Sequence, residues 1–318
     1  MSEKNLGIIG GGQLGSMLST AAKKLNIKTT IFCDDIDAPA QNFCDHFIYG
    51  QYDDKEKILE FIKNVDVITY EFENIPYETL NEMNKFKPVL PKPSVNRLIQ
   101  HRIAEKDFIN KLNIRTTRYV SIEKKSDIET LGDFLPGILK TTTMGYDGKG
   151  QYPIKKIEDV NSLNIDFSKG YILEKLVKLK KEISVIVTRF GIHRYEIYEP
   201  IENTHENQIL KHSVIPAEIS KKILEQSKDW ATQIAEELKY IGTLCVEFFI
   251  DRNENLYVNE IAPRVHNSGH LTINAYNISQ FENHVRAVCS IEKIPLKKIS
   301  NAKMVNLIGG QIEPYRQN

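Results

Sequence analysis

Two carboxylates, Glu247 and Glu260, are the residues whose surroundings point most directly to chemistry. They lie in two stretches of strand composition, 244–250 and 256–261, which are joined by polar residues typical of a hairpin turn. With the turn centred in that linker, strand pairing places Glu247 roughly opposite Asn259 and Glu260. Facing carboxylates among apolar residues repel each other, and a divalent cation with oxygen ligands, such as Mg²⁺, would neutralise them. The alternative is a carboxylate that points outward from an exposed sheet face.

Lys140 and the glycine-rich stretch 145–151 (GYDGKGQ) indicate a second polar site. Lys140 ends the apolar stretch 138–140, where a cation costs free energy unless an anion meets it. The glycines and hydroxyl groups that follow suit the covering of a polyphosphate, although no G-K-[ST] opens a helix as in a Walker A loop. The alternative is a flexible hairpin tip with a solvated lysine.

The stretch 10–15 (GGGQLG) places a G-x-G-x-x-G pattern between a short apolar strand and an amphipathic helix. Such glycines let the backbone approach a phosphate, and the helix N-terminus offers N–H groups to it. Asp34 and Asp35 end the second strand, about where a carboxylate would hold the ribose of NAD. The pattern is therefore typical of a dinucleotide enzyme, but it also fits glycines that merely allow close packing of helix and sheet. A domain that stops after about four strands weakens the NAD interpretation.

Hydrogen-bond donors gather directly after the second strand of the hairpin. Arg264, His266, Asn267 and Ser268 could hold an oxyanion or a phosphate. His266 and His270 have the i, i+4 spacing of zinc ligands, but no Glu lies between them as in H-E-x-x-H. The segment therefore favours anion binding over zinc.

The composition argues against several classes of protein. The 318 residues hold 42 Lys+Arg and 42 Asp+Glu, so the basic excess of a general nucleic-acid or acidic-membrane binder is missing. The four cysteines form no C-x-x-C pair, which disfavours a disulfide scaffold and a zinc site. The sequence contains no apolar run approaching a membrane span and no signal-peptide pattern. We therefore expect a cytoplasmic protein.

The elements that must position these residues follow from the pattern along the chain. Strand-like and helical stretches alternate through the first 92 residues, which predicts βαβ units and a parallel sheet. A helical stretch at 95–112 leads into short strands from 116 to 190, and a long helix at 220–239 precedes the hairpin. We expect a combined α/β and α+β fold with units at 1–92, 93–190 and 191–318.

Seven motifs occur in order: GGGQLG at 10–15, YEFENIP at 70–76, GYDGKGQ at 145–151, EPIEN at 199–203, VNEIAPRVHNSGH at 258–270, SQFE at 279–282 and MVNLIG at 304–309. Together they closely resemble the N5-carboxyaminoimidazole ribonucleotide synthase family of ATP-grasp ligases. The resemblance implies a Rossmann-like N-terminal domain followed by an ATP-grasp fold, whose central A domain and C-terminal domain sandwich ATP. It implies that ATP, bicarbonate and aminoimidazole ribonucleotide give the N5-carboxy product, ADP and phosphate through carboxyphosphate, in de novo purine synthesis.

The resemblance also implies roles for individual residues. Those implied for ATP are Arg102, Lys140, Gly145, Tyr146, Asp147, Gly148, Lys149, Gly150, Gln151, Glu174, Lys175, Leu176, Val177, Glu182, His205, Asn259 and Glu260. Glu247 and Glu260 would bind Mg²⁺ or Mn²⁺. Gln13, Leu14 and Glu71 would contact the ribonucleotide, which reassigns the glycine pattern at 10–15 from NAD to this substrate. The pocket for bicarbonate and carboxyl transfer would be lined by Tyr146, Arg264, His266, Asn267 and Ser268.

The implied partners are the small-molecule substrates and a second copy of the chain in a homodimer, with no nucleic acid and no membrane. Three other functions stay open from the sequence. They are another ATP-grasp ligase, such as one that uses formate and glycinamide ribonucleotide, an NAD-dependent dehydrogenase, and a truncated ATP-binding protein without catalysis. The VHNSGH stretch is the feature that discriminates against the first.

The C-terminal end of the sequence differs from that of the family it resembles. Members of the family continue past MVNLIG into a segment with a Lys and then an Arg-Lys-x-Gly-His cluster, which grips the ribonucleotide phosphate. This sequence ends nine residues after Gly309 without such a cluster. Either the sequence is truncated or the protein lacks part of its substrate clamp, and in both cases we expect ATP binding to be kept. Loss of two charge-assisted hydrogen bonds would weaken ribonucleotide binding roughly 10²- to 10⁴-fold.

Overall fold

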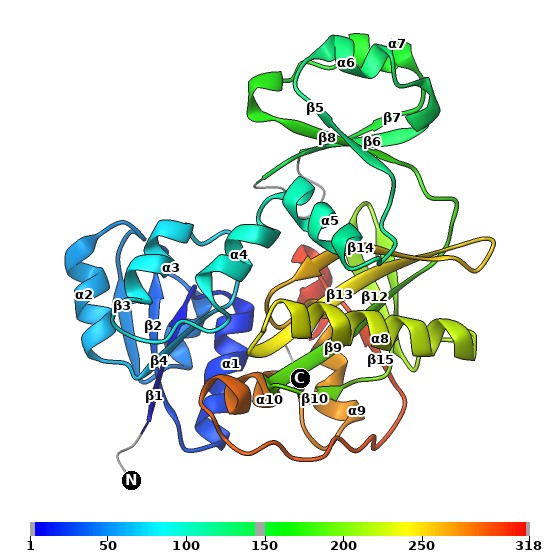
Figure 1. Cartoon of the computed structure of the whole chain (residues 1–318). Helices are drawn as coiled ribbons and strands as arrows, with labels where there is room; N and C mark the ends of the chain where they lie inside the picture. Colours follow the sequence, from blue (N-terminus) through cyan, green and yellow to red (C-terminus); the bar gives the residue numbers. More distant parts are fainter. Residues whose placement is uncertain (1–3, 144–149, 316–318) are drawn as a thin grey trace.

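The computed structural model describes residues 4–143 and 150–315, which form three sheets (Figure 1). The strands of the first sheet are β1 (Asn5–Ile9), β2 (Lys28–Cys33), β3 (His46–Tyr49) and β4 (Val67–Tyr70), and its helices are α1 (Gln13–Lys24), α2 (Lys55–Lys63) and α3 (Tyr77–Met83). The strands pair in parallel in the order β3-β2-β1-β4, which confirms the prediction from the alternation of strand and helix. Leu6, Ile8 and Phe32 are fully buried in its core.

Two helices and a small antiparallel sheet follow. The predicted helical stretch at 95–112 forms two helices, α4 (Pro93–Ile99) and α5 (Arg102–Lys111). The small sheet contains β5 (Tyr119–Ile122), β6 (Gly137–Thr141), β7 (Gln151–Ile154) and β8 (Tyr171–Lys175), in the order β5-β8-β6-β7. The short helices α6 (Lys125–Glu129) and α7 (Ile157–Asn161) cover its outer side (Figure 1). Leu139 and Leu173 are fully buried beneath them, so this sheet has its own core.

A large antiparallel sheet forms the rest of the molecule. Its strands are β9 (Leu179–Gly191), β10 (Arg194–Ile197), β11 (Ile201–Glu206), β12 (Ile209–Ile215), β13 (Gly242–Asp251), β14 (Leu256–Ala262) and β15 (Ala302–Val305). The order is β14-β13-β9-β11-β12-β15, and β10 pairs with β9. The boundary expected at residue 190 would separate β9 from this sheet, because β9 pairs with both β13 and β11. A boundary between β8 and β9 keeps every strand with its partners.

Helices pack on the large sheet, and one of them connects it to the N-terminal sheet. The predicted helix at 220–239 is α8 (Lys221–Glu237), whose Ile223 and Ile234 are buried against β9 and β13. The helices α9 (Thr272–Ala275) and α10 (Gln280–Val288) follow the hairpin. Val285 of α10 packs in one core with Leu18 of α1, so α10 joins the large sheet to the N-terminal sheet.

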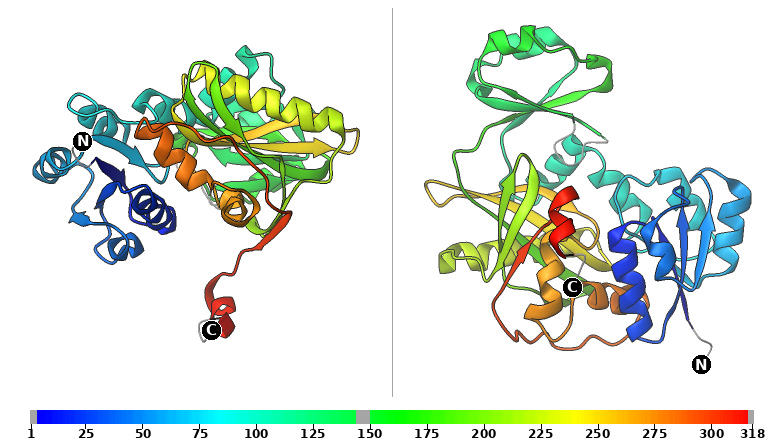
Figure 2. Two further views of the ribbon diagram at one scale, coloured as in Figure 1. Left: turned by 90° about the horizontal axis from the view of Figure 1, so that it is seen from below. Right: turned by 180° about the vertical axis from the view of Figure 1, so that it is seen from behind.

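The last described segment of the chain lies outside the large sheet. Beyond β15 the described part of the chain leaves the large sheet and forms a 3-10 helix at Gly309–Tyr315, which extends away from the body of the molecule in the left view of Figure 2. Within the described ranges, we find no helix that is long and apolar enough to cross a membrane.

Candidate active site

A cleft of about 600 Å³ lies between the small sheet and the large sheet, bordered by α5. Its lining brings together many of the residues that the sequence singled out: Arg102, Lys140, Gln151, Glu174, Lys175, Leu176, Val177, Glu182, His205, Glu247, Asn259, Glu260, Arg264, His266 and Asn267. The residues Gln13, Leu14, Glu71, Gly150 and Ser268 are not part of the lining. Gly145, Tyr146, Asp147, Gly148 and Lys149 lie outside the described residues.

The hairpin brings the carboxylate pair together. Glu247 on β13 pairs directly with Glu260 on β14, which confirms the register predicted from the turn. The next pair is Phe248 with Val258, so Asn259 is the extra residue of a β-bulge. A bulge interrupts the alternation of side chains along a strand. Asn259 and Glu260 would point to opposite faces of a regular strand, yet both line the cleft beside Glu247.

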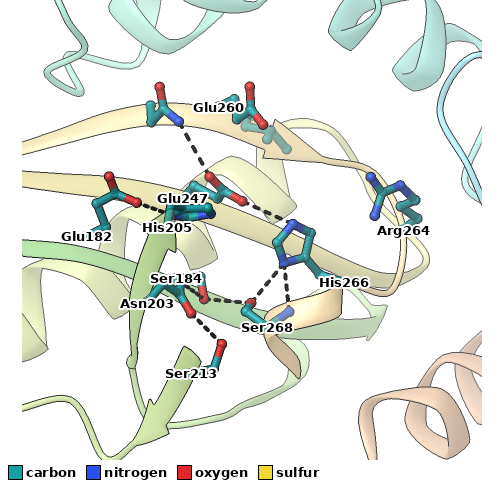
Figure 3. Close-up of polar contacts among 12 residues, drawn as sticks. Glu182, Ser184, Asn203, His205, Ser213, Glu247, Glu260, Arg264, His266 and Ser268 are labelled. Atoms are coloured by element: carbon teal, nitrogen blue, oxygen red, sulfur yellow. Dashed lines mark hydrogen bonds and ion pairs between the residues drawn. The ribbon is translucent and has the colours of Figure 1, made fainter. Parts of the chain in front are cut away.

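Each carboxylate of this pair has a hydrogen-bond donor of the protein beside it. Glu247 Oε1 lies 3.0 Å from His266 Nε2 (Figure 3). Glu260 Oε2 lies 3.2 Å from Arg102 Nη1. Burial alone would raise the pKa of Glu247, but the hydrogen bond from His266 lowers it. The hydrogen bond from His266 and the charge of Arg102 thus relieve part of the repulsion that the sequence analysis assigned to a divalent cation.

The donor atoms left at the bulge suit a hard cation. Asn259 Oδ1 is buried and accepts no hydrogen bond from the described residues, and the Glu260 side chain is 40% exposed at the cleft. The described part of the chain offers no cluster of three or more His, Cys, Asp or Glu side chains that could enclose a metal. Mg²⁺ is typically held by one or two carboxylates together with substrate phosphates and water, so this incomplete set of oxygens fits Mg²⁺.

A buried charge cluster lies on the opposite wall of the cleft. Glu174 Oε1 is 3.1 Å from Lys140 Nζ, and Glu174 Oε2 is 3.3 Å from Lys106 Nζ. Burial would raise the pKa of Glu174, but Lys106 and Lys140 together lower it to about 2. The anion that the sequence required for Lys140 is thus present within the chain, and the cluster keeps one positive charge in excess. That excess favours an anionic ligand.

Two residues of α5 that the sequence analysis missed support this region. Lys106 is 1% exposed and also donates to Thr117 Oγ1 at 2.9 Å. Glu105 Oε1 accepts from the backbone N–H of Ile261 at 2.6 Å, beside the bulge. Burial, and then the charge of Glu260, raise the pKa of Glu105 to about 8. The spacing of Arg102, Lys106 and buried Ile109 at i, i+4 and i+7 is the signal that could have revealed a charged residue on the inner face of α5.

Arg264 has a partner that the sequence analysis also missed. Arg264 Nη2 donates to Glu73 Oε1 at 3.1 Å, and Arg264 Nε donates to the second oxygen of Glu73. Burial would raise the pKa of Glu73, but Arg264 lowers it. Glu73 belongs to the same YEFENIP motif as Glu71, which could have drawn attention to it. The pair links the N-terminal domain to the end of β14 at the edge of the cleft.

The glycine pattern at 10–15 surrounds a carboxylate of the chain. The oxygens of Glu71, which is 6% exposed, accept from the backbone N–H groups of Gly12 and Gly15. A Cβ atom at Gly10 would lie 2.6 Å from Glu71 Cγ, and Gly10 has a φ of +97°. The N–H groups that the sequence assigned to a phosphate are therefore donated to Glu71, and the glycines are explained by this close approach. The structure gives no support to the NAD interpretation.

Glu182 and His205 form a further pair in the lining of the cleft. The two residues lie on the neighbouring strands β9 and β11 and touch through Glu182 Oε2 and His205 Nδ1 (Figure 3). Burial opposes the charged form of His205, but the hydrogen bond and charge of Glu182 raise its pKa. The cleft therefore offers two histidines, His205 and His266, each held by a carboxylate.

Comparison with known proteins shows which families this chain is similar to. A model of the ATP-grasp domain matches residues 107–281, and a model of the ribonucleotide synthetase preATP-grasp domain matches residues 3–100. An N5-carboxyaminoimidazole ribonucleotide synthase of Staphylococcus aureus is 37% identical over 97% of this chain and 83% of its own length. The enzyme of that name from Bacillus subtilis is 38% identical over 97% of this chain and 82% of its own.

Solved structures agree with these relatives. The crystal structure of an N5-carboxyaminoimidazole ribonucleotide synthetase in complex with ADP matches with a TM-score of 0.94 at 36% identity, over 100% of this chain and 86% of that one. A synthase from Aspergillus clavatus in complex with ADP and 5-aminoimidazole ribonucleotide matches with a TM-score of 0.88 at 26% identity, over 97% of this chain and 83% of that one.

Proposed function

Because this chain belongs to the N5-carboxyaminoimidazole ribonucleotide synthase family of ATP-grasp proteins, we propose that it carboxylates 5-aminoimidazole ribonucleotide. ATP, bicarbonate and the ribonucleotide give the N5-carboxy product, ADP and phosphate, a step of purine biosynthesis. The single observation that carries the proposal is the one cleft in which the carboxylate hairpin, the Lys140 cluster and the donors after β14 meet. The family resemblance further suggests a homodimer and a cytoplasmic location, and both stay predictions.

The lysine cluster and the strand that follows it would bind the nucleotide. Lys140 and Arg102 would meet the phosphates, and the glycine-rich stretch at 145–151 would cover them. Glu174–Val177 would run along the adenine edge, Glu182 would hold the ribose, and His205 would make a further contact. All the described members of this set except Gly150 line one cleft, which supports the assignment.

Glu247, Asn259 and Glu260 are the residues that would hold Mg²⁺, with the buried Asn259 Oδ1 as the clearest sign. The ion would supply positive charge beside the nucleotide phosphates. Arg102 lies next to Glu260 and would orient that carboxylate. Glu105 holds the backbone of β14 at Ile261 and thereby fixes the bulge.

The carboxyl transfer would take place beside the hairpin. A bicarbonate oxygen attacks the γ-phosphorus, the bond to the β-phosphate oxygen breaks, and carboxyphosphate and ADP result. The exocyclic amine of the ribonucleotide then bonds to the carboxyl carbon, and phosphate leaves with the bicarbonate oxygen. Arg264, His266 and Asn267 line the cleft and would hold the carboxyl group, with Tyr146 from the glycine-rich stretch. Carboxyphosphate hydrolyses readily, so water must be excluded at this point.

The remaining predicted residues would act next to this pocket. Gln13 and Leu14 would contact the ribonucleotide from the start of α1. Glu71 would shape the loop beneath them, as its contacts with Gly12 and Gly15 suggest. Ser268 is fully buried and donates to the ring of His266, so its role would be to position that histidine. We propose three units, with the second boundary between β8 and β9.

An assay of ADP release tests the proposal. ATP, Mg²⁺ and bicarbonate are supplied with aminoimidazole ribonucleotide, with glycinamide ribonucleotide and formate, or with neither. The proposal expects ADP release that depends on aminoimidazole ribonucleotide, together with a carboxylated product. Equal release in all three mixtures, or stimulation by glycinamide ribonucleotide and formate alone, would overturn it.

A further inference from the structure

A row of buried polar side chains crosses the large sheet next to Glu247, whose direct partner on the neighbouring strand is Ser184 (Figure 3). Ser184 lies on β9, Asn203 on β11 and Ser213 on β12, while Ser268 follows β14. Ser184, Ser213 and Ser268 are fully buried, and Asn203 is 7% exposed. The same layer contains an apolar core that includes Ile186, Ile201 and Ile215. Burial of a hydroxyl or amide in such surroundings is costly unless the group is hydrogen-bonded, so four of them together need a reason.

These side chains form one continuous chain of hydrogen bonds that ends at the hairpin. Ser213 Oγ donates to Asn203 Oδ1 at 2.8 Å, and Asn203 Nδ2 donates to Ser184 Oγ at 2.9 Å. Ser184 Oγ and Ser268 Oγ are 2.8 Å apart. Ser268 Oγ lies 2.8 Å from His266 Nδ1. The other ring nitrogen, Nε2, is the one that faces Glu247.

The direction of the whole chain is set at His266. The backbone N–H of Ser268 donates to His266 Nδ1 at 3.3 Å, and a backbone N–H can only donate. His266 Nδ1 is therefore an acceptor without a proton, and the ring proton is on Nε2, directed at Glu247 Oε1. The Ser268 hydroxyl must then donate to Nδ1, which leaves its oxygen to accept from Ser184. Ser184 can do so because its own oxygen accepts from Asn203.

We propose that Ser184, Asn203 and Ser213 are positioning residues, which act through Ser268 to hold His266 with Nδ1 as acceptor and Nε2–H toward Glu247. The inference rests on the proposed function only for the part that His266 plays in carboxyl transfer. A donor fixed at Nε2 keeps one oxygen of Glu247 occupied and the ring in one orientation at the cleft. None of the three positioning residues lines the cleft, so each acts through its neighbour.

The test compares Ser184→Ala with Thr188→Val on the same strand. Thr188 is also fully buried, and its hydroxyl lies 2.7 Å from that of Thr243, outside the chain that leads to the ring of His266. Both variants remove one buried hydroxyl. We expect Ser184→Ala to lower kcat for carboxylation about three- to tenfold with KM for ATP changed less than twofold. We expect Thr188→Val to lose only stability. If Ser184→Ala does not fold, Ser213→Ala takes its place, with Ser213→Thr as the variant that restores the hydroxyl.

The state of the His266 ring is measured independently of activity by ¹⁵N NMR of labelled histidine, with His266→Gln identifying the signal. Wild type should show an unprotonated Nδ1 and a protonated Nε2, and Ser184→Ala should show a mixture of tautomers. A protonated Nδ1 in wild type, or an unchanged ring signal and kcat in both the Ser184 and Ser213 variants, would overturn the inference. Absence of ribonucleotide-dependent ADP release by wild type would instead count against the proposed function, while the NMR result would still decide this one.

Discussion

At the scale of single residues, Glu260 joins several parts of the cleft. It faces Glu247 across the hairpin, lies 3.2 Å from Arg102, and its charge contributes to the raised pKa of Glu105. We predict that Glu260→Gln lowers kcat more than tenfold, over about 1.4 kcal/mol, while ADP binding weakens less, because charge compensation matters most at the transferring phosphoryl group. Steady-state kinetics and ADP titration measure the two effects. Glu254→Gln, a change in the turn of the hairpin, is the control, and a Glu260→Gln enzyme that keeps more than a tenth of kcat contradicts the metal assignment.

Lys106 and Glu174 form a second group whose energetics can be tested. Both are almost fully buried, and removal of one partner leaves an imperfectly compensated charge in the interior. We predict that Lys106→Met lowers the free energy of unfolding by about 3 kcal/mol. The double variant Lys106→Met/Glu174→Gln should lose clearly less than the sum of the two single changes. Urea unfolding of the four proteins measures this coupling, and strictly additive losses would show that the two charges do not depend on each other.

At the scale of elements, α5 supports the bulge through Glu105, and this contact predicts a pH dependence. The pKa of Glu105 is about 8 in the folded protein and near its ordinary value of 4.5 in the unfolded chain. The folded state therefore binds more protons between these values, so stability falls as pH rises from about 4.5 to 8. Glu105→Gln stays neutral and escapes this loss. We predict that the stability of the variant relative to wild type rises by about 2–4 kcal/mol between pH 5 and pH 8.5, measured by denaturant unfolding without nucleotide or Mg²⁺. An unchanged difference across this range would contradict the burial of an ionisable Glu105.

Some features of these elements could be predicted from the sequence, and others could not. The parallel sheet and the pairing of Glu247 with Glu260 were predictable, because alternation and a short turn are local features. The bulge at Asn259 was not, since it depends on how β14 pairs with β13. The glycine pattern at 10–15 was misleading for the same kind of reason. Its N–H groups meet Glu71, which is more than fifty residues away in the sequence and reaches them only through the pairing of β1 with β4.

At the scale of the whole molecule, the cleft lies between the small and the large sheet, and the N-terminal domain contributes Glu73 to its lining. Glu73 and Arg264 are 191 residues apart and link the N-terminal domain to the end of β14. Lys106 and Glu174 join α5 to the small sheet, and α10 packs on α1. Periodicity along the chain does not report such contacts, so Glu73, Glu105 and Lys106 escaped the sequence analysis. The motif resemblance supplied the residues around the cleft, and the fold shows which of them share it.

The central claim is that bicarbonate is phosphorylated in this cleft, and the fate of its oxygen tests that claim most directly. The reaction is run with ATP, Mg²⁺, aminoimidazole ribonucleotide and ¹⁸O-labelled bicarbonate, and the released phosphate is analysed by mass. If a bicarbonate oxygen attacks the γ-phosphorus and stays with it when the carboxyl carbon is transferred, each phosphate formed in the ribonucleotide-dependent reaction carries one ¹⁸O from bicarbonate. Phosphate without the label, in a reaction that still consumes ATP and ribonucleotide, would contradict the account.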